Sequence, residues 1–203
     1  MKIHRFQQQT EEWYNIKLGK VTGTVLDDIL GTPKAREGCF YEILGERLTP
    51  RVDMENIQES ALNRGNRLET PAIKAFEYVT GKKVERVGFV AHDEYPNIGY
   101  SPDGIIGETE DVEVKAPQIK NYMKIVLTNE VPKEYRAQII QAFVVNPKLE
   151  KRYFVAYNPD VETYPIHIIE VTRESLQEEI AEAFEAEKKF LAEIDEALNR
   201  FNK

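Results

Sequence analysis

The sequence predicts an α/β fold in which a mixed central sheet is flanked by helices. Segments with apolar residues at helical spacing alternate with short runs rich in β-branched and aromatic residues. Their order is helices, three strands, helices, strands and a final helix. The chain of 203 residues can bury one core, and 41% of its residues are hydrophobic. We therefore expect one domain over 1–203, with its core at about 60–157 and with N-terminal helices and a C-terminal strand and long helix as additions.

The beginning of the chain is predicted to be helical. Three short helices are expected, at 11–18, 22–30 and 37–48. The second has apolar residues at helical spacing, namely Val25, Leu26, Ile29 and Leu30. Pro50 then indicates a loop.

A longer helix is expected at 60–80, and it ends at Gly81, a residue type that often follows the last helical turn. Pro71 either kinks this helix or marks a new first turn, and both interpretations stay open. Three strands are expected next, at 84–90, 97–106 and 111–115. The short GETED segment before the last strand suits a hairpin turn.

The last part of the chain is predicted to contain further helices and strands. Two helices are expected at 119–127 and 133–145, with Pro132 before the second, and two strands at 152–157 and 165–171. A long helix runs from Glu174 and carries an apolar stripe formed by Leu176, Ile180, Phe184, Leu191, Ile194 and Leu198. This stripe is predicted to be core or a subunit contact.

Charge and cysteine content narrow the classes of site. The single Cys39 excludes an internal disulfide and Cys-rich zinc or iron–sulfur sites. The net charge of −8 argues against a surface that coats nucleic acid, although a local basic region exists at Arg64, Arg67, Lys82, Lys83 and Arg86.

No apolar run approaches the ~20 residues of a membrane span, and the N-terminus lacks a signal-peptide core. We expect no membrane association and a cytoplasmic location.

The stretch SPDGIIGETEDVEVKAP, residues 101–117, concentrates charged groups around the predicted hairpin. Side chains at i and i+2 of a strand share a face, so Glu113 and Lys115 project together. Asp103 lies across the hairpin and meets them if the register is right. Two converging carboxylates repel each other unless a cation lies between them, and oxygen ligands without His or Cys suit Mg²⁺ or Mn²⁺.

Such a site has a defined chemistry. Bound Mg²⁺ lowers the pKa of a water ligand and offsets phosphate charge, and Lys115 can orient the attacking water or stabilise developing charge. The alternative is an exposed hairpin in which Glu113 and Lys115 form a solvated ion pair of little consequence for stability. Pro102 and Gly104, which fix the turn around Asp103, favour the metal site.

The pieces SPDG and EVK, with the predicted order of elements, resemble the core of the PD-(D/E)XK nuclease superfamily. Within it, the sequence is similar to the lambda-type phage exonucleases, also called YqaJ-like viral recombinases or alkaline exonucleases. Four further pieces carry this resemblance: WYNIKLGKVTGT at 13–24, RGNRLE at 64–69, YVTG at 78–81 and YRAQ at 135–138. The resemblance implies a restriction-endonuclease-like core.

The resemblance implies roles for the charged residues. Asp103 and Glu113 would bind the catalytic Mg²⁺, for which Mn²⁺ substitutes, with the Val114 carbonyl as a further ligand. Lys115 would be the catalytic lysine. Glu69 would reach a second metal or its water from the preceding helix, and the alternative for it is an ordinary acid on a helix surface.

The resemblance also places Lys17 and Thr24 where the family holds the 5′-phosphate of a DNA end. A cation and a hydroxyl near a helix start suit a phosphate. The family usually has Arg and Ser there, and Lys lacks the fork of Arg, so a solvated helix face is the alternative for Lys17. Trp13 would shape this pocket and Leu62 would be the wedge that separates the terminal base pair, although both also fit core positions.

Tyr135 and Gln138 lie three residues apart on one predicted helical face. The resemblance indicates that they hydrogen-bond the scissile strand or a metal-bound water. Gln141 extends the same face.

The implied function is a Mg²⁺-dependent exonuclease that digests one strand of linear double-stranded DNA from its 5′ end. It would release mononucleotides and leave 3′ single-stranded tails for phage recombination, as a single nuclease domain. The resemblance further implies a homotrimer around DNA and a single-strand annealing protein as partner. It also implies a phage- or prophage-encoded protein in the cytoplasm of a bacterial host.

Two other functions stay open. A restriction- or repair-type endonuclease can use the same core, and closed circular DNA distinguishes it from an end-dependent enzyme. The second is a non-catalytic DNA-end-binding module. The intact set of Asp103, Glu113 and Lys115 argues against that module, because a degenerate site is expected to have lost at least one of them.

Overall fold

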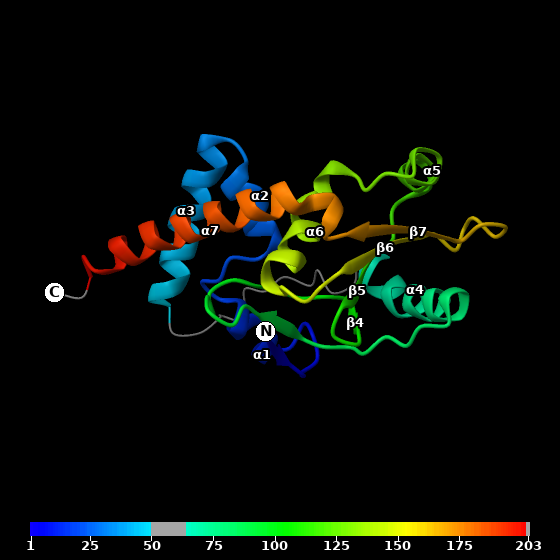
Figure 1. The fold of residues 1–203 in the computed structure, drawn as a ribbon, viewed down its shortest axis with the longest axis horizontal. Coiled ribbons are helices and arrows are strands. Elements are labelled where there is room, and N and C mark those ends of the chain that lie inside the picture. The colour runs from blue at the N-terminus through cyan, green and yellow to red at the C-terminus, as the bar shows by residue number, and fades with distance from the viewer. Residues whose placement is uncertain (50–63, 202–203) are drawn as a thin grey trace.

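The strands form two sheets in the computed structural model, which describes residues 1–49 and 64–201 (Figure 1). The larger sheet comprises, in spatial order, Gly104–Ile106 (β4), Glu110–Lys115 (β5), Lys151–Tyr157 (β6) and Ile166–Thr172 (β7). β5 and β6 are parallel, whereas both outer pairs are antiparallel. The smaller sheet is antiparallel and comprises Lys2–His4 (β1), Phe89–Ala91 (β2) and Gly99–Tyr100 (β3). The predicted mixed sheet is confirmed.

Helices cover both faces of the larger sheet (Figure 1). Helix α4 (Arg64–Thr80) packs on one face, where its apolar side chains meet those of β5 and β6: Ala72, Ile73, Phe76, Val112, Val114, Tyr153 and Val155. Helices α5 (Ile119–Thr128) and α6 (Lys133–Val145) lie on the opposite face. Because side chains alternate along β5, Glu113 and Lys115 point toward the α6 side.

In the described residues before α4 there are three helices, and the second of them packs on α6. They are α1 (Glu11–Lys17), α2 (Gly23–Leu30) and α3 (Pro33–Leu48). Helix α3 begins before the predicted residue 37 because the Thr32 side chain accepts a hydrogen bond from the Ala35 N–H and Pro33 favours a first turn. Residues 21 and 98 form a parallel bridge that joins the start of α2 to the smaller sheet.

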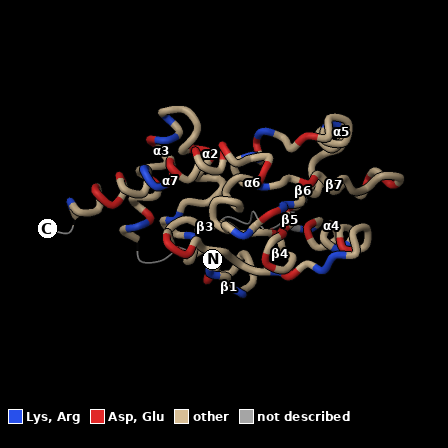
Figure 2. Tube along the Cα trace, in the orientation of Figure 1, with Lys and Arg blue, Asp and Glu red and all other residues tan. Residues whose placement is uncertain are grey.

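The C-terminal segment consists of a 3₁₀ turn, η3 (Glu174–Leu176), and the long helix α7 (Gln177–Leu198). Its predicted apolar stripe belongs to the core of the chain. Leu176, Leu191 and Ile194 are buried, and Ile180, Phe184 and Leu198 pack against the same core. Acidic residues recur along α7 (Figure 2). Within the described residues, no helix has the length and apolarity needed to cross a bilayer.

Two predicted strands differ from the structure. The strand expected at 97–106 is divided, so that β3 and β4 belong to different sheets. Pro102 has no N–H to donate, and its carbonyl accepts a hydrogen bond from Gln8 rather than from a neighbouring strand. The strand expected at 84–90 is reduced to the short β2, with Glu85 in an isolated bridge to Ile105. The prediction of two continuous strands is therefore wrong.

Other local predictions agree with the structure. The turn between β4 and β5 contains Gly107 with φ of 64°, a left-handed conformation that favours glycine. Pro71 lies inside one continuous helix, which ends before Gly81. Strand β1, by contrast, is absent from the sequence prediction: it has only three residues and forms by pairing with β2.

Candidate active site

Asp103 lies at the junction between the two sheets and points at β5. Gly104 pairs with Val112, which places Asp103 level with Glu113. The Val114 N–H donates a hydrogen bond of 2.6 Å to Asp103 Oδ2. The aspartate therefore reaches β5 between Glu113 and Lys115, as the hairpin pattern predicts.

Glu113 and Lys115 occupy the same face of β5 and contact each other. Lys115 Nζ lies 2.7 Å from Glu113 Oε1. Glu113 is only 6% exposed, whereas Lys115 is partly exposed. This pair is a largely desolvated contact and not the exposed ion pair of the alternative interpretation.

The pKa values of these groups respond to burial and to one another. Burial raises the pKa of Asp103 well above its usual range, and the nearby Glu113 and Glu69 raise it further. Burial also acts to raise the pKa of Glu113, but Lys115 and Arg152 outweigh it, so the pKa is lowered. For Lys115, burial acts to lower the pKa, and Glu113 and Asp103 reverse that effect and raise it. The carboxylates repel each other, and a bound cation would relieve this repulsion.

The donors at this position fit a magnesium-type ion. Among the described residues, no group of three or more His, Cys, Asp or Glu side chains gathers in a way that could hold a metal. The candidate donors are the carboxylates of Asp103 and Glu113, together with the main-chain carbonyl of Val114 that the resemblance implies. Mg²⁺ commonly takes one or two carboxylates and keeps several water ligands, so this small oxygen set suits it.

Glu69 approaches the same region from α4. Its side chain is 18% exposed, and Arg86 Nη2 forms an ion pair with Glu69 Oε1. Its negative charge is close enough to raise the pKa of Asp103. The structure therefore brings Glu69 near Asp103, with Arg86 as its ion-pair partner.

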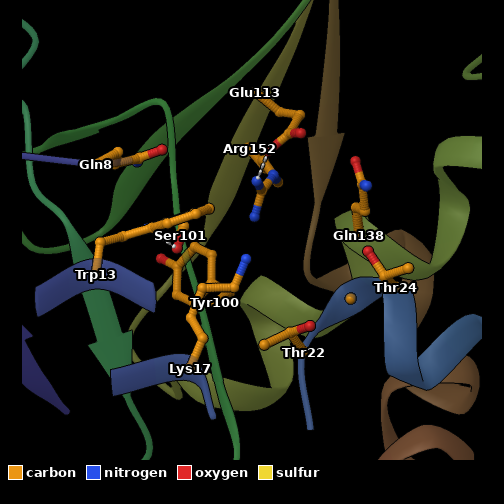
Figure 3. A pocket seen from close by; sticks show the side chains of 11 residues that line it. Gln8, Trp13, Lys17, Thr22, Thr24, Tyr100, Ser101, Glu113, Gln138 and Arg152 are labelled. Atoms are coloured by element: carbon orange, nitrogen blue, oxygen red, sulfur yellow. Dashed lines mark hydrogen bonds and ion pairs between the residues drawn. The ribbon is translucent and has the colours of Figure 1, made fainter. Parts of the chain in front are cut away.

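A cavity of about 170 Å³ joins Glu113 to the N-terminal helices (Figure 3). The side chains that line it come from α1, α2, β3, β5, α6 and β6, and include Trp13, Lys17, Thr22, Thr24, Tyr100, Glu113, Gln138 and Arg152. The structure thus unites residues predicted for phosphate binding with one residue of the predicted catalytic set. These parts of the chain are far apart in sequence.

Trp13 is fixed on one wall of this cavity. Its Nε1 donates hydrogen bonds to the Gly88 carbonyl at 3.1 Å and to Ser101 Oγ at 2.9 Å. Lys17 Nζ lies 3.8 Å from the centre of the Trp13 ring, a cation–π contact. Burial lowers the pKa of Lys17 to about 8, although Glu46 opposes this effect. Lys17 is therefore not a solvated surface lysine.

The first turn of α2 lines the cavity opposite Trp13. Thr22 precedes the helix without capping it through its side chain, and Thr24 lies in the first turn. The N–H groups at the start of a helix favour anions. Thr24 and the helix terminus therefore offer donors next to the Lys17 cation.

Helix α6 supplies Tyr135 and Gln138. Lys115 Nζ lies 5.0 Å from the centre of the Tyr135 ring. Gln138 Oε1 is buried and has no hydrogen-bond partner in the described part of the chain. Gln141, by contrast, is fully buried and donates to the carbonyls of Val21 and Gly99, so it is structural. Leu62 lies outside the described residues.

Sequence reasoning missed Arg152 and Asp111. Arg152, on β6, is directly paired in register with Asp111 on β5. Arg152 Nη1 lies 3.2 Å from Asp111 Oδ2, and Nη2 forms an ion pair with Glu113 Oε2. The signals in the sequence were an arginine at the start of a predicted strand and an acid two positions before Glu113.

The sequence comparison decides the family. The pattern of the YqaJ-like viral recombinase domain matches residues 12–148, more than half of the chain. The chain belongs to this family. A comparison with curated proteins gave no match.

Solved structures agree with membership in the YqaJ-like family. The alkaline exonuclease LHK-Exo from Laribacter hongkongensis is 27% identical, with a TM-score of 0.83 and coverage of 95% of this chain and 96% of that chain. LHK-Exo in complex with dAMP is 28% identical, with a TM-score of 0.82 and the same coverage. A phage related exonuclease from Haemophilus somnus 129PT, 16% identical over 90% of this chain and 96% of that chain, shares the fold with a TM-score of 0.61. The predicted family and fold class are confirmed, and the predicted enzyme class is that of these structural relatives.

Proposed function

We propose that this YqaJ-like protein is a Mg²⁺-dependent exonuclease that degrades one strand of linear double-stranded DNA from its 5′ end. One observation carries the proposal: the cavity that Glu113 lines is also lined by Lys17 and by Thr24 at the start of α2. A 5′-phosphate seated by these donors would place the first phosphodiester beside Glu113. An end-dependent reaction follows from that arrangement.

Asp103, Glu113 and the Val114 carbonyl are the proposed metal ligands. The nuclease family implies a divalent ion, and the oxygen-only donor set favours Mg²⁺, with Mn²⁺ as a substitute. When bound, the ion supplies a water of lowered pKa and offsets negative charge on the phosphate. Glu69 is proposed to bind a second ion, or a water ligand of that ion, after Arg86 releases Oε1 of Glu69.

Lys115 is the proposed catalytic lysine. Its ammonium already lies at Glu113 Oε1, so a short movement would bring it to the attacking water or to a phosphate oxygen. The ring of Tyr135 limits the space around Nζ. Gln138, whose buried Oε1 has no hydrogen-bond partner among residues 1–49 and 64–201, is proposed to accept a hydrogen bond from a water ligand or to orient the scissile strand.

Lys17 and Thr24 are proposed to bind the 5′-phosphate, with Trp13 as the wall that holds Lys17. The close cation–π contact and the partial burial make the ammonium a weakly hydrated anion ligand. Leu62 is proposed as the wedge between the terminal bases, from its position in the sequence alone.

We propose that the enzyme releases mononucleotides and leaves 3′ single-stranded tails for recombination. The complex of the related LHK-Exo with dAMP, a mononucleotide, supports the first part of this proposal. We also propose that residues 1–203 form one nuclease domain with its core at about 60–157. We further propose a homotrimer, a single-strand annealing partner and a location in the cytoplasm of a phage-infected bacterium, as the resemblance to the family implies. Light scattering of the purified protein tests the trimer.

The deciding experiment uses a linear duplex with 5′-phosphates and a label at the 5′ end. Wild-type protein with Mg²⁺ should release the label as a mononucleotide, whereas addition of EDTA or the substitution Asp103→Ala should abolish release. Loss of label from the 3′ end first would contradict the proposed direction. Persistent cleavage by Asp103→Ala would contradict the proposed site.

The endonuclease alternative is tested in the same assay with closed circular duplex DNA. An end-dependent enzyme leaves the circle intact, and a restriction- or repair-type enzyme opens it. A protein that binds ends without cleaving either substrate would support the non-catalytic module.

A further inference from the structure

Asp111, Glu113 and Arg152 form a buried ion triad that includes one proposed metal ligand, Glu113. The exposed fractions of the three residues are 0%, 6% and 1%, respectively. Two carboxylates on one face of β5 share a single guanidinium from β6. In Figure 3 this guanidinium lies between Glu113 and the ring of Tyr100. Its Cζ is 5.3 Å from the centre of that ring.

The triad depends on the fork of an arginine. The parallel register sets Arg152 beside Asp111, and Glu113 lies two residues further along the same face. One guanidinium nitrogen reaches Asp111 and the other reaches Glu113, an arrangement that a lysine ammonium does not reproduce. Anchored at Asp111 and enclosed by the core, Arg152 holds Glu113 Oε2 in a fixed position.

The other oxygen of Glu113 has a different kind of partner. Lys115 reaches Oε1 through a side chain that is 22% exposed, whereas the side chain of Arg152 is 1% exposed. The two oxygens of Glu113 are therefore unequal: the partner of Oε2 is locked, and the partner of Oε1 can leave.

We propose that Arg152 is a positioning residue that binds Oε2 of Glu113. Of the two oxygens of this carboxylate, Oε1 is then the one that binds a divalent ion. Lys115 is the exchangeable partner, which gives up Oε1 when the site is loaded and turns toward the substrate phosphate. This inference rests on the proposed function. It adds the assignment of one ligand atom and of two distinct roles for the two neighbouring cations.

The alternative is that Arg152 only stabilises the fold or only competes with a metal as a nearby positive charge. A buried ion triad is a poor stabilising device, because apolar residues of similar volume often stabilise a core equally well. Charge competition and positioning predict opposite changes in metal affinity when Arg152 is replaced. Removal of a competing cation raises metal affinity, whereas removal of a positioning group lowers it.

The test measures Mn²⁺ binding to the full-length protein without DNA, from the electron paramagnetic resonance signal of free Mn²⁺. Lys115→Met should raise Mn²⁺ affinity a few-fold, because it vacates Oε1. Arg152→Met should lower the affinity about 10-fold or more, the usual effect of losing a group that orients a metal ligand. A rise in affinity for Arg152→Met, like that of Lys115→Met, would overturn the positioning role.

Arg173→Met is the matched control. Arg173 is a partly buried arginine that donates to the carbonyls of Phe143, Asn146 and Leu149, away from the proposed ligands. This variant should lower the melting temperature and leave Mn²⁺ affinity unchanged. If Arg173→Met weakens Mn²⁺ binding as much as Arg152→Met, the effect is general destabilisation and the proposal fails.

A second variant keeps the proposal testable if Arg152→Met does not fold. Asp111→Asn retains the guanidinium but removes the charge that anchors it, so Mn²⁺ affinity should fall by a smaller factor. Unchanged affinity would contradict the anchor. Asp103→Ala separates this inference from the proposed function: if it leaves wild-type Mn²⁺ affinity intact, the ion binds elsewhere and the proposed metal site itself is wrong.

Discussion

The ionisation of Lys17 depends on the position that the fold gives it. An ordinary lysine has a pKa near ~10.4. Burial beside Trp13 lowers the pKa of Lys17 to about 8, so its charge changes within the range in which enzymes are assayed. An arginine at this position would stay charged. The lysine therefore makes the proposed phosphate site sensitive to pH.

We expect the preference for 5′-phosphorylated over 5′-hydroxyl ends to fall as pH rises through about 8. The protonated ammonium binds the phosphate, and the neutral amine does not. The measurement is kcat/KM for both substrates between pH 7 and 9.5, because this ratio reports ionisations of the free enzyme. Lys17→Arg should keep the preference to higher pH.

Lys17→Met serves as the control and should lack the preference at every pH. An identical decline in wild type and Lys17→Arg would show that another group titrates. The charge of Lys17 would then have no part in end recognition.

At the scale of elements, the contact between α2 and α6 sets the width of the cavity. Gly23, in the first turn of α2, packs against Gln138 on α6. A Cβ at position 23 would lie 2.8 Å from the Gln138 Cα, which is main chain and has little freedom to move. Thr24 and Gln138 line the cavity from the two sides of this contact. Only glycine allows the two helices to come this close.

Gly23→Ala should therefore separate the two helices and displace Thr24 from Gln138. We expect a loss of stability of about 1–3 kcal/mol, typical of overpacking, together with a raised KM for 5′-phosphorylated DNA. Thermal denaturation and steady-state kinetics measure the two effects.

Gly38→Ala is the matched control for this change. Gly38 lies in the exposed part of α3, and a Cβ there would contact nothing within 4 Å. Because alanine favours a helix, this variant should be as stable as wild type or more stable, with unchanged KM. A Gly23→Ala protein that behaves like Gly38→Ala would refute the close-packing argument.

At the scale of the whole molecule, α7 packs against α2, α3 and α6 and carries a fully buried acid. Glu187 is 0% exposed, and burial raises its pKa to about 8. The folded protein thus keeps a proton on Glu187 that the unfolded chain loses near its usual pKa of 4.5. Between these values the unfolded state binds fewer protons, so stability falls as pH rises.

Glu187→Gln removes this dependence, because the amide does not ionise. The melting temperature of the variant should exceed that of wild type by an amount that grows from pH 5 to about 8 and then levels off. For a chain of this length, a difference of a few degrees in melting temperature corresponds to about 1 kcal/mol in the free energy of unfolding. Circular dichroism melts in EDTA measure it without interference from metal binding.

Glu185→Gln provides the comparison on the same helix. The side chain of Glu185 is 73% exposed and pairs with Lys188, so its replacement should change the melting temperature little at any pH. A gap between Glu187→Gln and wild type that does not vary with pH would contradict the titration of Glu187.

The sequence by itself determined the order of most elements and the grouping of Asp103, Glu113 and Lys115. These features depend on short-range rules: helical spacing, the alternation of side chains along a strand, and a hairpin closed by Gly107. The same rules failed at residues 97–106, because strand-forming residues on both sides of the SPD segment suggested one strand where the chain passes from one sheet to the other.

Only the tertiary structure decided which distant groups meet at the site. Arg152 reaches Glu113 because β5 and β6 are parallel and in a particular register, and that register results from packing on both sheet faces. Trp13 and Lys17 join the same cavity because α1 packs beside the segment that precedes Asp103. No local pattern encodes such contacts, since the free energy that selects them comes from burial of the whole core.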